Sequence, residues 1–207
     1  HHTFHAGGWQ SGYVAVDDPA LTADNRRYFC FEVLDAVNVV AVNGAPSSIR
    51  RNDELLFLRA ALAAGGAESN PIQVTSVRAN AFQGASLDDV RLVILANVET
   101  LPEAAVGKLE RFVDRGGSLL VFLGDQAQPS FYNKLLSSSD RARGGLLPAQ
   151  LSGGAPKGNA TSGEDQPLVT GVGEFAQDHP ALSGFGSGET GRLGAVGFSA
   201  YWRLDPA

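Results

Sequence analysis

The sequence predicts an α/β fold, in which helices flank a parallel sheet. Three mainly apolar runs indicate this, at residues 37–42, 92–96 and 118–123, with Asn38 and Ser118 as their polar residues. Runs of this length without polar alternation are typical of strands buried on both faces. Helical periodicity lies between them, so the order strand, helix, strand indicates βαβ units, whose crossovers are right-handed in about 98% of cases. We therefore expect a Rossmann- or flavodoxin-like parallel sheet from about Asp35 onwards.

Two helices and one further strand are expected between these runs. Leucines at helical spacing over residues 55–62 predict the first helix, with Ser47 or Asn52 as its N-cap. Pro102 begins the second helix, because proline suits the first helical turn. Residues 72–77 predict the additional strand.

The first part of the chain has a different pattern. Runs rich in Val, Tyr and Phe at residues 12–17 and 27–33 are separated by turn formers, which predicts an antiparallel pair of strands. No βα rhythm precedes residue 35. We interpret residues 1–34 as the last strands of a preceding β-sandwich domain and residues 35–207 as the α/β domain.

The C-terminal part of the chain changes in composition. A segment rich in Gly and Ser near residues 152–166 is expected to form a flexible loop. One apolar-polar strand is expected around residues 195–204. An end so soon after a strand, and a sequence without methionine, lead us to expect a truncated piece of a longer polypeptide.

Composition narrows the classes of partner. The chain is 43% hydrophobic and 18% charged, which is typical of a globular protein. Its net charge is −6 and its Lys and Arg residues form no blocks, so a nucleic acid is a disfavoured partner. No stretch approaches the roughly 20 apolar residues of a membrane-spanning helix.

The single cysteine, Cys30, lies between Phe29 and Phe31. One cysteine excludes an internal disulfide and a multi-cysteine metal cluster. Reactive thiols need an exposed, electropositive setting, so the aromatic neighbours predict a buried small hydrophobic side chain.

Polar residues follow the predicted parallel strands. Ligands of open parallel sheets bind beyond the carboxyl ends of the strands. The candidate binding crevice therefore consists of Asn43, Asn97, Glu99, Asp125 and Gln126. The alternative is that these residues serve only turns and helix caps. Asp125 and Glu99 could also form a pair for acid/base chemistry or for a hard metal ion, although the sequence shows no third ligand.

Standard catalytic motifs are absent from the sequence. It contains no G-x-S-x-G elbow, and the glycine pairs at residues 7–8, 65–66 and 144–145 match neither G-x-G-x-x-G nor the P-loop. His179 is followed by Pro180, which favours a turn residue over a catalytic base. We therefore expect neither a cofactor nor a bound metal.

Three segments carry a resemblance to a known family: residues 39–44 (VVAVNG), 92–98 (LVILANV) and 112–125 (FVDRGGSLLVFLGD). They resemble the class I glutamine amidotransferase-like domain of bacterial BatA/von Willebrand A-type membrane proteins. Residues 16–21 and 23–29 resemble the close of the β-sandwich that precedes this domain in such proteins, and together the similarity covers most of residues 12–151. Active members place a cysteine at the elbow after the strand that here ends at Leu123. This chain has Gly124-Asp125 there, and loss of a triad nucleophile typically costs about 10⁶ in turnover. The resemblance therefore implies a catalytically degenerate member.

These observations support a non-catalytic ligand- or protein-binding module of a larger membrane-anchored bacterial protein. Its partners would be other domains of the same polypeptide or separate proteins, and it would reach the membrane only through segments outside this sequence. The extracytoplasmic side is favoured. One alternative is a hydrolase that uses Asp125 and Glu99, with or without a metal. Another is a spacer whose crevice binds nothing.

Overall fold

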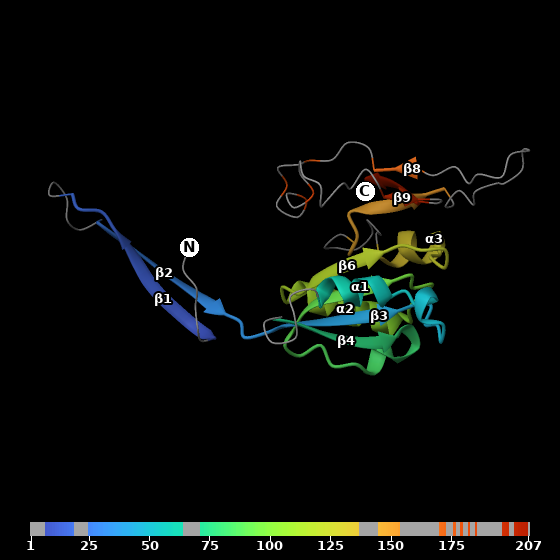
Figure 1. Cartoon of the computed structure of the whole chain (residues 1–207), viewed down its shortest axis with the longest axis horizontal. Helices are drawn as coiled ribbons and strands as arrows, with labels where there is room; N and C mark the ends of the chain where they lie inside the picture. The colour runs from blue at the N-terminus through green and yellow to red at the C-terminus, as the bar shows by residue number, and fades with distance from the viewer. Residues whose placement is uncertain are drawn as a thin grey trace, which may run out of the picture.

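The computed structural model describes residues 7–18, 25–63, 71–136, 145–153, 170–172, 176, 179, 182, 185, 196–198 and 201–206. Its centre is a parallel four-stranded sheet with the order β4-β3-β5-β6 (Figure 1). The strands are β3 (Val37–Asn43), β4 (Ile72–Arg78), β5 (Val90–Ala96) and β6 (Ser118–Phe122). All three pairings are parallel, which confirms the predicted α/β class with a parallel sheet.

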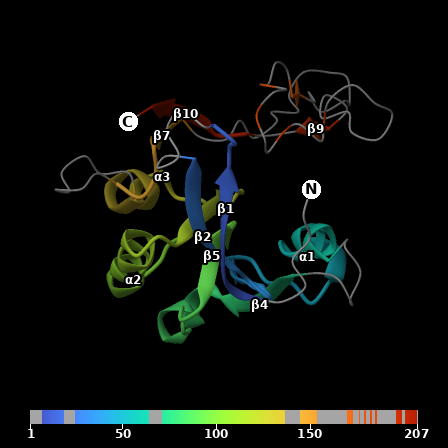
Figure 2. The ribbon, with the colours of Figure 1, turned by 90° about the vertical axis from the view of Figure 1, so that its left-hand side faces the viewer.

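Helices α1 (Leu56–Leu62) and α2 (Glu103–Asp114) lie on opposite sides of this sheet (Figure 2). Successive side chains of a strand point to opposite faces, so each helix packs on alternate residues of β3 and β5. The face under α2 is the larger apolar cluster, with Val40, Val42, Val93, Leu95, Val106, Leu109 and Phe112. The face under α1 is smaller, with Val39, Ala41, Leu55, Ile94 and Ala96.

The described residues cover only one face of the edge strand β6. Leu119 and Val121 pack against the larger cluster, whereas Leu120 and Phe122 are exposed. The predicted strand is therefore confirmed, but its apolar run is only partly buried, on the side of α2, and is not buried on both faces as expected.

The start of α1 differs from the prediction. Ser47 and Asn52 were expected as caps, but the N-cap position is Leu55 and no side chain caps it. Asn52 belongs to the short 3-10 helix η2 (Arg50–Asn52). The Asp53 carboxylate accepts the Leu55 N–H at 3.0 Å and so binds the chain just before α1. An Asp two residues before its N–H partner forms an Asx-type turn, which competes with a regular cap.

The crossover between β4 and β5 is tied to α2. It contains the 3-10 helix η3 (Ala79–Gly84), whose Phe82 is fully buried. The Lys108 ammonium group donates to the carbonyls of Phe82, Gln83 and Ala85. Burial lowers the pKa of Lys108. This lysine therefore connects α2 to the segment that precedes β5.

An antiparallel hairpin precedes the sheet and extends away from it (Figure 1). It consists of β1 (Gly8–Ala15) and β2 (Arg26–Val33), paired from Gly8↔Val33 to Ala15↔Arg26. The predicted antiparallel pair is confirmed, with β1 starting four residues earlier than expected. That it closes a β-sandwich stays a prediction.

The expectation for Cys30 is wrong. Cys30 is exposed, because no described residue covers either face of the hairpin around it. Aromatic neighbours in the sequence therefore do not produce a buried environment here.

The C-terminal segments lie beyond β6, on the side away from β3 and β4 (Figure 1). They include α3 (Pro129–Phe131), the π-helical turn η4 (Tyr132–Leu136), β7 (Ala149–Ser152), β8 (Thr170–Gly171), β9 (Gly197–Phe198) and β10 (Arg203–Pro206). The single strand expected around residues 195–204 is wrong: β9 pairs with β8, while β10 pairs with β7. The flexible loop expected near residues 152–166 lies, from residue 154, outside the described residues.

Within the described parts of the chain, no helix combines the length and the apolar character needed to cross a membrane.

Candidate functional site

The candidate site lies at the carboxyl ends of β3 and β5. Here the chain order of the strands reverses, since β4 lies on one side of β3 while β5 and β6 lie on the other. We call this region the carboxyl edge, formed by Asn43, Asp53, Glu54, Asn97 and Asp125. Asn43 is 6% and Asn97 is 3% exposed, and they are the buried polar side chains among the described residues.

Asn97 is the centre of the carboxyl edge. Its Nδ2 donates to Glu54 Oε1 and to Asp125 Oδ1, both at 2.8 Å. Its Oδ1 accepts the Gln126 N–H at 2.9 Å. Both amide hydrogens are therefore used, and one side chain joins the loop before α1 to the turn after β6.

The backbone around Asn97 requires its neighbours to be small. Asn97 has a φ of 48°, a left-handed conformation in which Asn is enriched. A Cβ on Gly44 would collide with the Asn97 backbone, and a Cβ on Gly124 would collide with the Asn97 side chain. Glycine at both positions therefore leaves the space that Asn97 occupies between β3 and β6.

A second network surrounds Asn43. Its Nδ2 donates to Asp53 Oδ2 at 3.0 Å, and its Oδ1 accepts the Ala45 N–H at 3.2 Å. The Ser47 N–H donates to the same Asp53 oxygen at 3.4 Å. Burial alone would raise the pKa of Asp53, but the hydrogen bonds that it accepts outweigh burial and lower this pKa. Asp53 therefore shapes the loop as an anion.

Asp125 is also an anion at neutral pH. The hydrogen bond from Asn97 is the main cause that lowers its pKa, against the opposing effect of desolvation. A general acid that works near pH 7 needs a raised pKa instead. The Asp125 carboxylate is therefore suited to accepting hydrogen bonds and poorly suited to donating a proton.

The structure separates the five predicted crevice residues into groups. Asn97, Asp125 and the backbone of Gln126 share one network, while Asn43 belongs to the adjacent one. Glu99 instead accepts a hydrogen bond from Gln128 Nε2 at 2.7 Å. The second carboxylate that binds the Asn97 amide, beside Asp125, is that of Glu54.

Sequence reasoning missed Asp53 and Glu54. A signal was available, because they lie in the loop that follows β3 and such loops reach the carboxyl edge of a parallel sheet. His179, by contrast, fits the expected turn: its N–H donates to the Ala176 carbonyl and its carbonyl accepts the Leu182 N–H.

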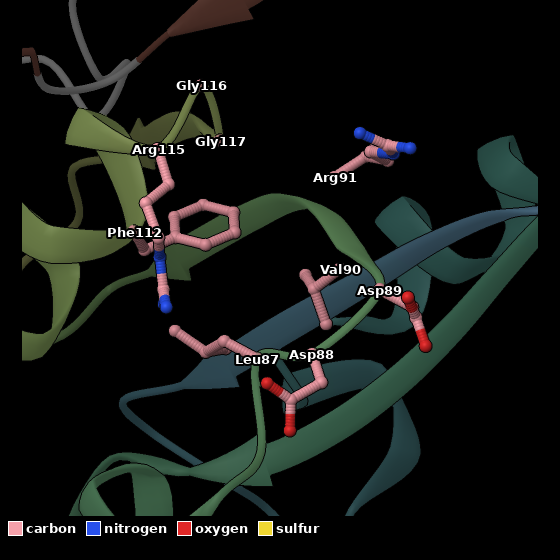
Figure 3. Close-up of a pocket in the computed structure, with 9 residues that line it drawn as sticks. All are labelled: Leu87, Asp88, Asp89, Val90, Arg91, Phe112, Arg115, Gly116 and Gly117. Atoms are coloured by element: carbon pink, nitrogen blue, oxygen red, sulfur yellow. The ribbon is translucent and has the colours of Figure 1, made fainter. Parts of the chain in front are cut away.

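A hollow of about 210 Å³ lies at the opposite end of the sheet, beside the starts of β5 and β6 (Figure 3). This is below the roughly 300–1,000 Å³ of typical small-molecule sites. Its lining mixes acidic, basic and apolar residues: Leu87, Asp88, Asp89, Val90, Arg91, Phe112, Arg115, Gly116 and Gly117. The hollow is therefore separate from the carboxyl edge, and neither positive nor negative charge predominates in its lining.

Among the described residues, no group of three or more His, Cys, Asp or Glu side chains is arranged to hold a metal ion. No family model matches the chain, and comparisons with curated proteins and with solved structures found no match either.

Proposed function

We propose that this chain is a non-catalytic protein-binding module and that the β1–β2 hairpin is its contact element. One observation carries the proposal: the hairpin exposes five aromatic side chains, Trp9, Tyr13, Tyr28, Phe29 and Phe31. Trp9 and Tyr28 are 72% and 74% exposed. Aromatic residues are enriched at protein interfaces, and large exposed apolar patches mark interaction sites.

The apolar side chains lie on both faces of the hairpin. Cross-strand partners share a face, so Trp9, Tyr13 and Tyr28 lie on one side. Tyr13 and Tyr28 contact each other with ring centroids 5.8 Å apart. Phe29 and Phe31 stack on the other side at 5.9 Å. A two-stranded hairpin is marginally stable in water by itself, so a partner that covers these rings would also stabilise it.

The carboxyl edge supports a non-catalytic function. Its two buried amides, Asn43 and Asn97, donate hydrogen bonds to carboxylates of the loops that follow the strands. Asp125 stands where the resemblance to amidotransferase-like domains would place a nucleophile, and its lowered pKa suits a structural anion. In this proposal the sheet is flavodoxin-like, in agreement with its strand order, and presents the hairpin within a larger membrane-anchored bacterial protein.

Site-specific photo-crosslinking tests the proposal. The photoreactive residue p-benzoylphenylalanine would replace Tyr28 in the full chain, in the cell that produces it. Phe57 of α1 is the matched control, because it is an aromatic residue with a similar exposure of 78%. We expect crosslinked species from position 28 and few from position 57. Equal yields from both positions, or none from position 28, would overturn the proposed contact element.

A further inference from the structure

The outer edge of β1 lacks the features that normally protect an edge strand. Natural edge strands carry charged residues, prolines or β-bulges that prevent pairing with other chains. The eight residues of β1 (GWQSGYVA) include no charge and no proline, and their register with β2 has no bulge. The partner strand β2 has Arg26, Arg27 and Glu32. The unprotected edge of the hairpin is therefore β1.

One hydrogen bond shows which backbone groups of β1 face outward. The Val16 N–H donates to the Asn25 carbonyl at 2.9 Å, one position beyond the pair Ala15↔Arg26. Antiparallel pairs alternate between hydrogen-bonded and non-hydrogen-bonded. Even-numbered residues of β1 therefore bond to β2, and the odd-numbered residues direct their N–H and C=O groups away from it. These are Trp9, Ser11, Tyr13 and Ala15.

We propose that a second copy of this chain pairs with the outer edge of β1, antiparallel and about a two-fold axis at Ser11. This inference rests on the proposed function and names the partner of the same hairpin. In this register Trp9 of each copy lies opposite Tyr13 of the other. The two hairpins then form one four-stranded sheet.

Self-pairing suits this strand for two reasons. Because β1 has no charged residue, it meets its own copy without opposing like charges, which would destabilise a cross-strand pair. The Ser11 register also extends the Tyr13–Tyr28 contact by Trp9 of the second copy, and aromatic cross-strand pairs are favourable. A register centred on Gly12 would instead place Trp9 opposite Ala15. Three or more strands with an apolar face are needed for independent stability, which the dimer provides.

Sedimentation velocity of the full chain over a concentration series tests the dimer. Ser11→Lys would place two ammonium groups opposite each other at the two-fold axis. We expect it to weaken the dimer roughly five- to tenfold. Cys30→Lys is the matched control, because Cys30 pairs with Ser11 on the same face but lies one strand farther from the axis. We expect its dissociation constant to stay close to that of the parent chain.

Nitroxide labels test the register in a chain that also carries Cys30→Ser. Labels attached after Ser11→Cys should lie in adjacent strands, whose Cα atoms are about 5.5 Å apart in a hydrogen-bonded pair. Labels after Ala15→Cys should be separated by roughly 27 Å along the strands, from eight residues at about 3.4 Å each. The reverse order of distances would overturn the register.

The two proposals fail in different ways. A chain that stays monomeric at every concentration, or equal effects of the two lysine variants, would overturn the dimer. If position 28 then still crosslinked to another protein, the hairpin would remain the contact element, and its partner would be that protein and not a second copy of the chain. If position 28 yielded no crosslinks, the contact element would fail as well.

Discussion

Replacement of Asn97 by Asp tests whether this residue joins the loops of the carboxyl edge. The substitution preserves size, the acceptor for the Gln126 N–H and tolerance of the left-handed backbone. It removes both hydrogen bonds that Nδ2 donates, to Glu54 and to Asp125. Each of these hydrogen bonds contributes only about 1–2 kcal/mol to the free energy of unfolding, because solvent screens the exposed carboxylates that accept them. We expect the free energy of unfolding to fall by about 2–4 kcal/mol at pH 7.

The loss should depend on pH in a defined direction. Two neighbouring carboxylates raise the pKa of the carboxyl group that Asn97→Asp introduces, in the folded state. The folded state then binds this proton more tightly than the unfolded chain does. Stability is therefore lost as pH rises, and the deficit shrinks as pH falls toward about 4.

Urea unfolding followed by far-ultraviolet circular dichroism, at neutral and at mildly acidic pH, measures both effects. Asn38→Asp is the matched control, because the Asn38 side chain donates one exposed hydrogen bond to the Asp89 carbonyl. It should cost about 1 kcal/mol or less. An equal deficit in the two variants, or a deficit at Asn97 that grows on acidification, would refute the role of Asn97.

The remaining predictions concern the same edge and the core. Gly124→Ala should lower stability by about 1–3 kcal/mol through its collision with Asn97, whereas Gly84→Ala, with open space around it, should not; urea midpoints compare them. Burial raises the pKa of Tyr132 to about 12, so Tyr132→Phe should remove the phase of an ultraviolet tyrosine titration that occurs at the highest pH. The same substitution should lower the free energy of unfolding by about 1–2 kcal/mol, because the Tyr132 hydroxyl donates to a buried carbonyl. The pKa values of Asp53 and Asp125 are lowered in the folded state, so both carboxylates stabilise the fold above pH 3.8, and this stabilisation is lost as the pH falls through their folded pKa values. Asp125→Asn should therefore reduce the fall in melting temperature between about pH 5 and pH 2.

The sequence contained enough information for the sheet. The β-branched run of β3 and the apolar run of β5 predict strands buried on both faces, and Val40 and Ile94 are indeed 4% and 1% exposed. Strand order could not be predicted in the same way, because it depends on which strands pair and not on local pattern. The position of Asn97 at the carboxyl edge followed from the end of β5.

The errors have physical reasons. Helical periodicity identifies Leu58 and Leu62 of α1, which pack against the smaller apolar cluster, but it does not identify the polar residue that binds the preceding loop. That residue is Asp53, which accepts hydrogen bonds from three groups that no local sequence pattern connects. Cys30 was expected to be buried because its neighbours are aromatic. Burial, however, needs a second layer, and the described residues provide none over the hairpin.

The Trp202 indole N–H donates to the Gly124 carbonyl at 2.9 Å, and its ring packs against the larger apolar cluster. The chain has one other tryptophan, Trp9, which is 72% exposed. Intrinsic fluorescence therefore combines a solvated emitter on the hairpin with a sheltered one beside the turn after β6. Trp9→Phe would leave a single optical reporter of that turn, and the difference between the two spectra would follow the hairpin alone.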